Sequence, residues 1–319
     1  LSLVGSEMCI RDRWLTYEAA PAFDRAFRVR PAAPDGPPLL WFGLYDQPQS
    51  LPSGALLGAG EALPGPWQPD ISEAGYRRAL RRIKGHIARG DTYQVNFTYR
   101  LRAPFLSPSW PVFAALANAH AAPYAAFVET RDWAVCSISP ELFFHLDGDT
   151  LTGRPMKGTA PRGRTLEEDR RLAAWLGRSV KNRAENVMIV DMLRNDMGRI
   201  ARTGSVQVPD LFTVEKYPTV WQMTSTVKAE TGAGYGEIFR ALFPCASITG
   251  APKVRTMQII AELETDPRQV YTGAIGFFAP GRRAQFNVAI RTLLVDKRRG
   301  EAEYGVGGGI VWDSRPGSE

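Results

Sequence analysis

The last third of the chain contains apolar runs that are separated by very short turns. Three stretches, 273–278, 284–294 and 302–310, have the composition of β-strands, and turns at Pro280-Gly281 and Arg299-Gly300 lie between them. Strands joined by such short turns pair antiparallel, whereas a parallel pair needs a crossover of about a dozen residues or more. This region therefore predicts an antiparallel sheet.

Helical patterns precede these strands. Residues 71–88 place apolar side chains at close to helical spacing, and Thr165-Leu-Glu-Glu168 is a capping box that opens one long helical stretch. Pro252 opens a helix over 252–263, at a position where its missing N–H costs nothing. Shorter runs predict further elements, namely strands over 95–101, 125–129, 133–139, 142–146 and 218–227 and helices over 111–120 and 235–243. We predict an α+β fold in which antiparallel β-sheets pack in a sandwich-like core and the helices lie outside.

The balance of charge limits the classes of partner. The chain has 319 residues, with 39 Lys and Arg against 33 Asp and Glu, and basic and acidic residues are interspersed. This favours a small anionic ligand over nucleic acid, because no basic run resembles a nucleic-acid-binding tail. No apolar stretch approaches the roughly 20 residues of a membrane span. The three cysteines are widely spaced and form no CxxC pair, which indicates neither a disulfide framework nor a zinc site and favours a cytoplasmic location.

Three polar positions stand out, and each has an ordinary structural explanation. Glu141 follows a proline at the end of a predicted strand, where a carboxylate is usually a solvated turn residue. Lys157 precedes Gly158, which would let a ligand approach the backbone, although on its own a lysine in a surface loop is the leading interpretation. Glu185 lies one helical turn after Lys181, so a simple i,i+4 ion pair is the plain interpretation.

Two further segments could hold an anion. Residues 247–250, Ser-Ile-Thr-Gly, lead into the N-terminus of the helix over 252–263, where free N–H groups and the helix dipole favour negative charge. A helix cap explains this segment nearly as well. The glycines at 307–309 allow close approach to a ligand, or simply a tight bend. Taken singly, these segments are weak signals, and the chain has no Walker, dinucleotide, HExxH or G-x-S-x-G motif.

Taken together and in order, the segments resemble one family. PMKGT, RAENVMIVDMLRND, SITGAPKVRTM, YTGAIG, AIRT and GGGIVWDS are similar to stretches of the chorismate-utilising enzymes, which include anthranilate synthase component I, isochorismate synthase and aminodeoxychorismate synthase component I. The resemblance runs from about Trp14 to Glu319 and implies the fold of that family. Residues 71–319 then correspond to its chorismate-binding catalytic domain, which we expect to be truncated at the C-terminus. We interpret 14–70 as a truncated N-terminal portion, and 1–13, which lack an initiator Met and a signal peptide, as an adaptor remnant outside the fold.

Lys157 distinguishes the branches of this family. Anthranilate and isochorismate synthases typically have alanine at this position, whereas the aminodeoxychorismate enzymes have lysine. A lysine amine can attack the ring at C2 and expel the C4 hydroxyl, after which ammonia enters at C4 and releases the enzyme. The amine must first lose its proton, and lowering a pKa of about 10.4 by about three units costs roughly 4 kcal/mol. The resemblance thus implies formation of 4-amino-4-deoxychorismate, with ammonia from a glutamine amidotransferase partner.

The resemblance also implies roles for other residues. Glu141 matches the general acid/base, and Glu185 and Glu319 match carboxylates that bind Mg²⁺, a cation that prefers hard oxygen ligands. Arg291 and Tyr271 match the pair that holds the enolpyruvyl carboxylate of chorismate. The other implied substrate contacts are Gly158, Thr159, Gln222, Ser247, Thr249, Gly307 and Gly309.

Three departures from the family pattern bear on these expectations. Gln222 stands where several relatives have histidine, so we expect it to orient substrate but not to transfer protons. Asn182 stands where an acidic residue is frequent, and a further metal-binding carboxylate is expected shortly after Glu319. Two alternatives therefore stay open: an anthranilate synthase component I, and a catalytically impaired fragment that serves as a scaffold for an amidotransferase. A nucleic-acid binder ranks last.

Overall fold

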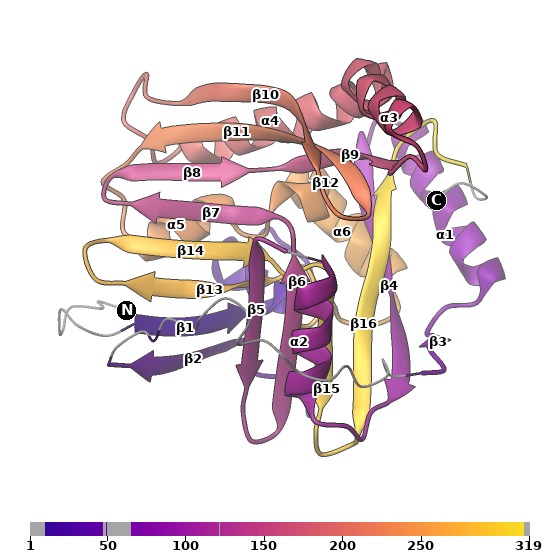
Figure 1. The fold of residues 1–319 in the computed structure, drawn as a ribbon, viewed down its shortest axis with the longest axis vertical. Helices are drawn as coiled ribbons and strands as arrows, with labels where there is room; N and C mark the ends of the chain where they lie inside the picture. The colour runs from indigo at the N-terminus through magenta and orange to yellow at the C-terminus, as the bar shows by residue number, and fades with distance from the viewer. Residues whose placement is uncertain (1–9, 47–48, 50–64, 121, 316–319) are drawn as a thin grey trace.

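Two antiparallel sheets form the framework of the molecule. The computed structural model describes residues 10–46, 49, 65–120 and 122–315. Within these residues the chain forms a nine-stranded sheet and a seven-stranded sheet. In Figure 1 the strands of the larger sheet run across the view, and those of the smaller sheet run from top to bottom. The predicted α+β class with antiparallel sheets is confirmed.

The nine-stranded sheet carries both the middle of the chain and its described N-terminal part. Its strands are, in spatial order, β10 (Gln207–Lys216), β11 (Val220–Glu230), β8 (Thr150–Arg154), β7 (Leu142–Asp147), β14 (Arg283–Val288), β13 (Ala274–Ala279), β1 (Ile10–Leu15) and β2 (Leu40–Tyr45), with β9 (Met156–Pro161) pairing with β11. The β7–β8 hairpin turns at Gly148, whose φ of +57° is a conformation that glycine adopts without strain.

The seven-stranded sheet and the helices complete the architecture. The strands of this sheet are β12 (Gly250–Ala251), β4 (Gln94–Pro104), β16 (Glu301–Ile310), β15 (Thr292–Asp296), β6 (Trp133–Ser139) and β5 (Tyr124–Glu129), with β3 (Gln68–Pro69) pairing with β4. The helices are α1 (Glu73–Ala88), α2 (Ser109–His120), α3 (Leu166–Arg178), α4 (Val180–Gly198), α5 (Tyr235–Leu242) and α6 (Lys253–Leu263), with 3₁₀ turns η1 (Tyr17–Ala22) and η2 (Ala246–Ile248). None of the helices in the described residues is long and apolar enough to cross a membrane.

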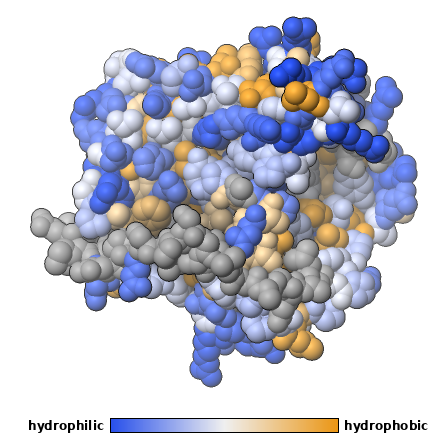
Figure 2. Space-filling view, in the orientation of Figure 1, coloured by the Kyte–Doolittle hydropathy of each residue, from blue (hydrophilic) through white to orange (hydrophobic). Residues whose placement is uncertain are grey.

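Apolar clusters hold the sheets and helices together. The largest cluster lies between the nine-stranded sheet and the helices behind it, and it includes Phe144 and Phe286 stacked at 5.2 Å. A second cluster joins the two sheets through Trp14, Val135 and Leu294. Burial of each side chain of this size stabilises the folded state by about 2–3 kcal/mol. In Figure 2 the visible face is mostly hydrophilic, and its apolar residues lie in separate patches. Such a surface is expected when most large apolar side chains are buried in the interior.

Strand β1 corrects one expectation from the sequence. From the sequence we expect residues 1–13 to lie outside the fold, whereas residues 10–13 form the first part of β1, between β13 and β2. The guanidinium of Arg13 lies 3.5 Å from the centre of the Phe278 ring, where the ring face attracts a cation. Residues 1–9 lie outside the described residues, and the division between 14–70 and 71–319 stays a prediction.

The helical stretch that follows Thr165 is two helices, where the sequence predicted one. Thr165 caps α3 as expected, because its hydroxyl accepts from the Glu168 N–H at 3.2 Å. Ser179 then adopts an extended conformation, and its hydroxyl accepts from the Asn182 N–H to start α4. Apolar spacing continues through this break, so periodicity alone cannot locate it. The break matters because it sets the direction of α4, which packs on β9.

The predicted strand over 284–294 is also two elements. The chain leaves the nine-stranded sheet after β14 and enters the seven-stranded sheet at β15. Arg291 takes a φ of +50° in the turn between them. The apolar residues are continuous because both halves are buried, which hides the crossing from a pattern argument. The crossing places Arg291 where the two sheets meet.

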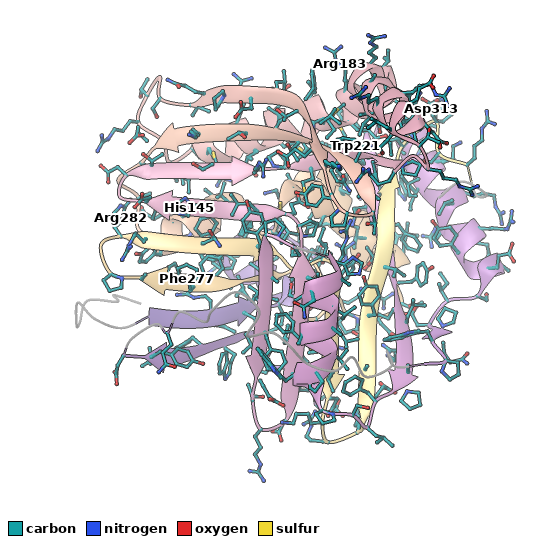
Figure 3. All side chains as sticks on the ribbon, in the orientation of Figure 1. His145, Arg183, Trp221, Phe277, Arg282 and Asp313 are labelled. Carbon is teal, nitrogen blue, oxygen red and sulfur yellow. The ribbon has the colours of Figure 1, made fainter. Side chains whose placement is uncertain are left out.

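Strands β8, β9 and β10 have no counterpart among the predicted elements. β10 is an edge strand with mostly exposed residues and irregular register against β11, so it lacks a regular alternation. β9 contains Lys157, which the sequence placed in a loop, and it pairs with β11 through Thr159 opposite Gln222. Trp221, labelled in Figure 3, anchors this corner because its indole N–H donates to Asp169 of α3 at 2.9 Å.

Candidate active site

A cavity of about 380 Å³ opens where the two sheets meet. The nine-stranded sheet contributes residues of β9 and β11, and the seven-stranded sheet contributes residues of β4 and β16. Most of the residues singled out from the sequence line this cavity, namely Glu141, Lys157, Gly158, Thr159, Gln222, Ser247, Tyr271, Arg291, Gly307 and Gly309. Segments that are far apart in the sequence therefore form one site.

Lys157 is held in the cavity by its strand and by one hydrogen bond. Its Nζ donates to the main-chain carbonyl of Ser247 at 2.9 Å. The next residue, Gly158, has a φ of +100°, and a Cβ there would lie 3.0 Å from the Cβ of Asn182 on α4. Glycine is thus required at 158 both by its backbone conformation and by the close approach of the helix.

Glu141 presents a buried carboxyl to the same space. The side chain is 3% exposed, and its Oε1 is buried with no hydrogen-bond partner among the described residues. Burial raises the pKa of Glu141 above its usual range, and the Ser247 hydroxyl and the positive charge of Lys157 offset this only in part. A carboxyl whose pKa is raised keeps its proton to higher pH, which suits a general acid.

Arg291 and Tyr271 lie at the crossing between the sheets. Tyr271 packs so closely on β16 that a Cβ at Gly305 would lie 2.2 Å from its ring. Burial raises the pKa of Tyr271 to about 12, so its hydroxyl stays neutral and can donate. Both residues line the cavity, and a guanidinium and a neutral hydroxyl are donors that suit a carboxylate. Tyr304, another residue of the cavity, also has a raised pKa because of burial.

Thr159 and Gln222 pair across adjacent strands. The Thr159 hydroxyl donates to Gln222 Oε1 at 3.1 Å, which leaves the amide N–H groups of Gln222 to face the cavity. Thr249 is placed differently. It is absent from the lining of the cavity, and its hydroxyl bonds the carbonyls of Cys245 and Ala246 within η2. A direct contact of Thr249 with substrate, as expected from the sequence, has no support in this geometry.

This arrangement agrees with what comparison with known proteins finds. Residues 56–319 match the family model described as chorismate binding enzyme. The chain belongs to the chorismate-binding enzyme family. It is 41% identical over 255 residues to the aminodeoxychorismate synthase component 1 of Salmonella typhimurium. The aligned residues cover 79% of this chain and 56% of that protein. The corresponding Bacillus subtilis protein is 42% identical over 257 residues, covering 80% and 54%.

Other members of the chorismate-binding enzyme family are nearly as similar. An anthranilate synthase component 1 of Haloarcula marismortui is 40% identical over 255 residues, covering 79% of this chain and 52% of its own length. The crystal structure of anthranilate synthase component I from Streptococcus pneumoniae TIGR4 superposes with a TM-score of 0.85 at 25% identity, covering 99% of this chain and 79% of that chain. The chain spans about half the length of the curated relatives it matches.

The magnesium site that the chorismate-binding enzyme family implies is represented here by one carboxylate. Glu185 lies on α4 between Asn182, which contacts Gly158, and Asn186, which donates to the carbonyl of Lys157. Its carboxylate lies 3.9 Å from Lys181 Nζ, one helical turn away. A carboxylate oxygen is a suitable Mg²⁺ ligand, but in the described part of the chain no three His, Cys, Asp or Glu side chains cluster to hold a metal. Glu319 lies outside the described residues.

Several residues of the cavity were not predicted from the sequence. They are Asn96, Pro140, Met156, Ile248, Ile290, Tyr304, Gly305 and Val306. In β4 polar residues at 94, 96, 98 and 100 alternate with apolar ones, which is the pattern of a strand with one solvent-exposed face, and only the structure shows that all four polar residues are buried. Such a polar face inside a buried strand costs about 1–3 kcal/mol for each group left without a partner, so it marks a site.

Proposed function

We propose that this chain carries the chorismate-converting activity of an aminodeoxychorismate synthase, which forms 4-amino-4-deoxychorismate from chorismate and ammonia. The observation that carries the proposal is Lys157, whose amine lies in the cavity with the buried carboxyl of Glu141. Alanine, typical of the anthranilate and isochorismate enzymes at this position, offers no nucleophile. The similarity to the Salmonella and Bacillus proteins supports the same assignment.

The reaction balances with these two residues alone. The unprotonated Lys157 amine bonds to ring C2 while the C4–O bond breaks, and the carboxyl proton of Glu141 leaves with the hydroxyl as water. Ammonia then bonds to C4, and the electron pair of the C2–N bond returns to Lys157. The new ammonium group gives a proton to the Glu141 carboxylate, which restores both residues.

The remaining residues hold the substrate in this sequence. Arg291 and Tyr271 bind the enolpyruvyl carboxylate. Pyruvate stays attached to the ring because nitrogen enters at C4 and not at C2. Gln222, oriented by Thr159, contributes amide donors. When Mg²⁺ is bound, it supplies positive charge for the ring carboxylate of chorismate, and Glu185 is the described residue that would hold it. The ammonia would come from a glutamine amidotransferase, consistent with the designation component 1 of the relatives.

A second candidate is anthranilate synthase component I. The Haloarcula protein of that name is almost as similar as the aminodeoxychorismate synthases. This reaction would need nitrogen at C2 and loss of pyruvate, and it would leave Lys157 without a covalent role. A chain that binds an amidotransferase without converting chorismate is the alternative of another class, and it predicts no Mg²⁺-dependent chorismate binding in calorimetry.

The test uses chorismate, Mg²⁺ and free ammonium, with products separated by chromatography. We expect aminodeoxychorismate from the wild type and at least a 100-fold loss of it in Lys157→Ala, with chorismate affinity within about threefold. Lys228→Ala removes an exposed lysine of β11 and is the matched control. Anthranilate as the wild-type product would establish the second candidate, and unchanged aminodeoxychorismate output from Lys157→Ala would refute the covalent role.

A further inference from the structure

Asn96 is the third residue of β4, and its backbone is hydrogen-bonded on both sides. Its N–H donates to the carbonyl of Thr249 at 2.8 Å, and its carbonyl accepts from Arg268 Nη2 at 2.7 Å. Arg268 is itself fully buried and paired with Glu264 at 2.6 Å. The Cα of Asn96 therefore has little freedom to move, and the direction of its side chain is set before any ligand arrives.

The carboxamide of Asn96 is directed into the cavity without a partner. The residue is 7% exposed, it lines the cavity, and no described residue hydrogen-bonds its side chain. Gln94, two residues earlier on the same face of β4, has both amide atoms buried and without partners among the described residues. A carboxamide that lines a cavity and has no hydrogen-bond partner among the described residues is available to bond a group that enters the cavity.

The register of β4 brings Asn96 to the side of the cavity that holds the amine. Asn96 pairs with Gly309 on β16. A Cβ at Gly309 would lie 3.6 Å from Lys157 Nζ. Arg291 and Tyr271 are cationic or donor groups suited to a carboxylate, whereas a carboxamide is uncharged and both donates and accepts. That chemistry matches a hydroxyl or an ammonia molecule.

We propose that the Asn96 carboxamide binds the group exchanged at C4 of the substrate, first the hydroxyl as its bond to C4 breaks and then the entering ammonia. This inference rests on the proposed function. Asn96 Oδ1 accepts an N–H of ammonia, so the lone pair of the nitrogen stays free to bond to C4. Asn96 is then a residue that touches both the leaving group and the nucleophile, beyond the contacts implied by the family resemblance.

The experiment measures kcat/KM for ammonia at saturating chorismate, and the chorismate Kd separately, in wild type, Asn96→Ala and Asn96→Ser. Losing one such hydrogen bond should lower kcat/KM for ammonia about 10- to 100-fold in Asn96→Ala, with the chorismate Kd within about threefold. Asn96→Ser retains a small acceptor and should recover part of the loss. Gln207→Ala, an exposed amide on β10, is the control for amide removal as such.

Each outcome decides between this inference and its alternatives. An equal loss in chorismate affinity and in kcat/KM for ammonia would make Asn96 a general substrate contact and overturn the proposal. Unchanged kinetics in Asn96→Ala, or no recovery in Asn96→Ser with a native melting temperature, would overturn it as well. The wild-type product tests the proposed function separately: anthranilate or no amination in the wild type overturns both, whereas aminodeoxychorismate with unchanged variants overturns only the role of Asn96.

Discussion

Lys157 Nζ and the main-chain carbonyl of Ser247 are joined by a hydrogen bond of 2.9 Å. The bond links β9 to the 3₁₀ turn η2, and it holds the amine on the side of the cavity that contains Glu141. Because the acceptor belongs to the main chain, its position does not depend on the rotamer of the Ser247 side chain. The amine is thus positioned before substrate binds, and the predictions below concern the groups that maintain this position.

Gly309→Ala is expected to disturb the amine directly. The added Cβ would lie 2.7 Å from Gln94 Nε2 and 3.6 Å from Lys157 Nζ, so the Gln94 amide must move and the space beside the amine shrinks. We expect kcat/KM for chorismate to fall about 10-fold or more, with the melting temperature nearly unchanged, because the clash is with the end of a flexible side chain. Gly232→Ala, where a Cβ meets nothing within 4 Å, is the control.

Glu141→Gln is expected to remove one limb of the pH profile. Burial raises the pKa of Glu141, so the acid form persists above the usual range and is lost as pH rises through the raised value. Wild-type kcat/KM should therefore decline on the alkaline side, and the variant should lose that decline together with about 100-fold or more of its activity. Persistence of the same alkaline limb in Glu141→Gln would assign it to another group.

Asn186→Leu is expected to weaken both the fold and the site. The Asn186 side chain is fully buried, accepts from the Ser225 hydroxyl at 2.6 Å and donates to the Lys157 carbonyl at 3.4 Å. Removing it leaves buried groups without partners, a loss of about 1–3 kcal/mol in the free energy of unfolding. The free energy of unfolding measured in urea and kcat should both fall. Val187→Ala, on the exposed face of the same helix, should change neither. A stable variant with wild-type kcat would contradict this.

Glu18→Gln is expected to flatten the dependence of stability on pH. Burial raises the pKa of Glu18 from 4.5 to about 7. Between these values the folded state binds a proton that the unfolded state has released, so the free energy of unfolding falls as pH rises from about 4.5 to 7, by roughly 3 kcal/mol. In the wild type the main-chain N–H of Arg268 donates to Glu18 Oε1 at 2.7 Å. Glutamine keeps an oxygen acceptor for this N–H but carries no charge.

Urea unfolding from pH 5 to pH 8 measures this effect as the difference between the variant and the wild type. The gain in Glu18→Gln should grow with pH up to about 7 and then stay level. Glu73→Gln, an exposed carboxylate on α1, should give a difference that does not change with pH in this way. A constant offset for Glu18→Gln across the range would mean that its carboxyl titrates alike in both states.

The sequence determined the local elements and the chemical content of the site. Thr165 caps a helix as its capping box predicts, and the predicted turn at Pro280-Gly281 joins antiparallel strands. These features depend on contacts within a few residues, which is the range over which caps, turns and periodicity act. The family resemblance likewise rested on short motifs, and the match over residues 56–319 confirms it.

Tertiary structure alone decided how those motifs meet. The chain crosses between sheets at Arg291, helices α3 and α4 separate at Ser179, and Asn96 faces the cavity, although none of these is visible in an apolar pattern. The partner of Lys157 lies 90 residues away in the chain. The propensity of a segment to form a helix or a strand depends on residues close in sequence. The burial of a polar strand face depends on groups that come together only when the two sheets pack.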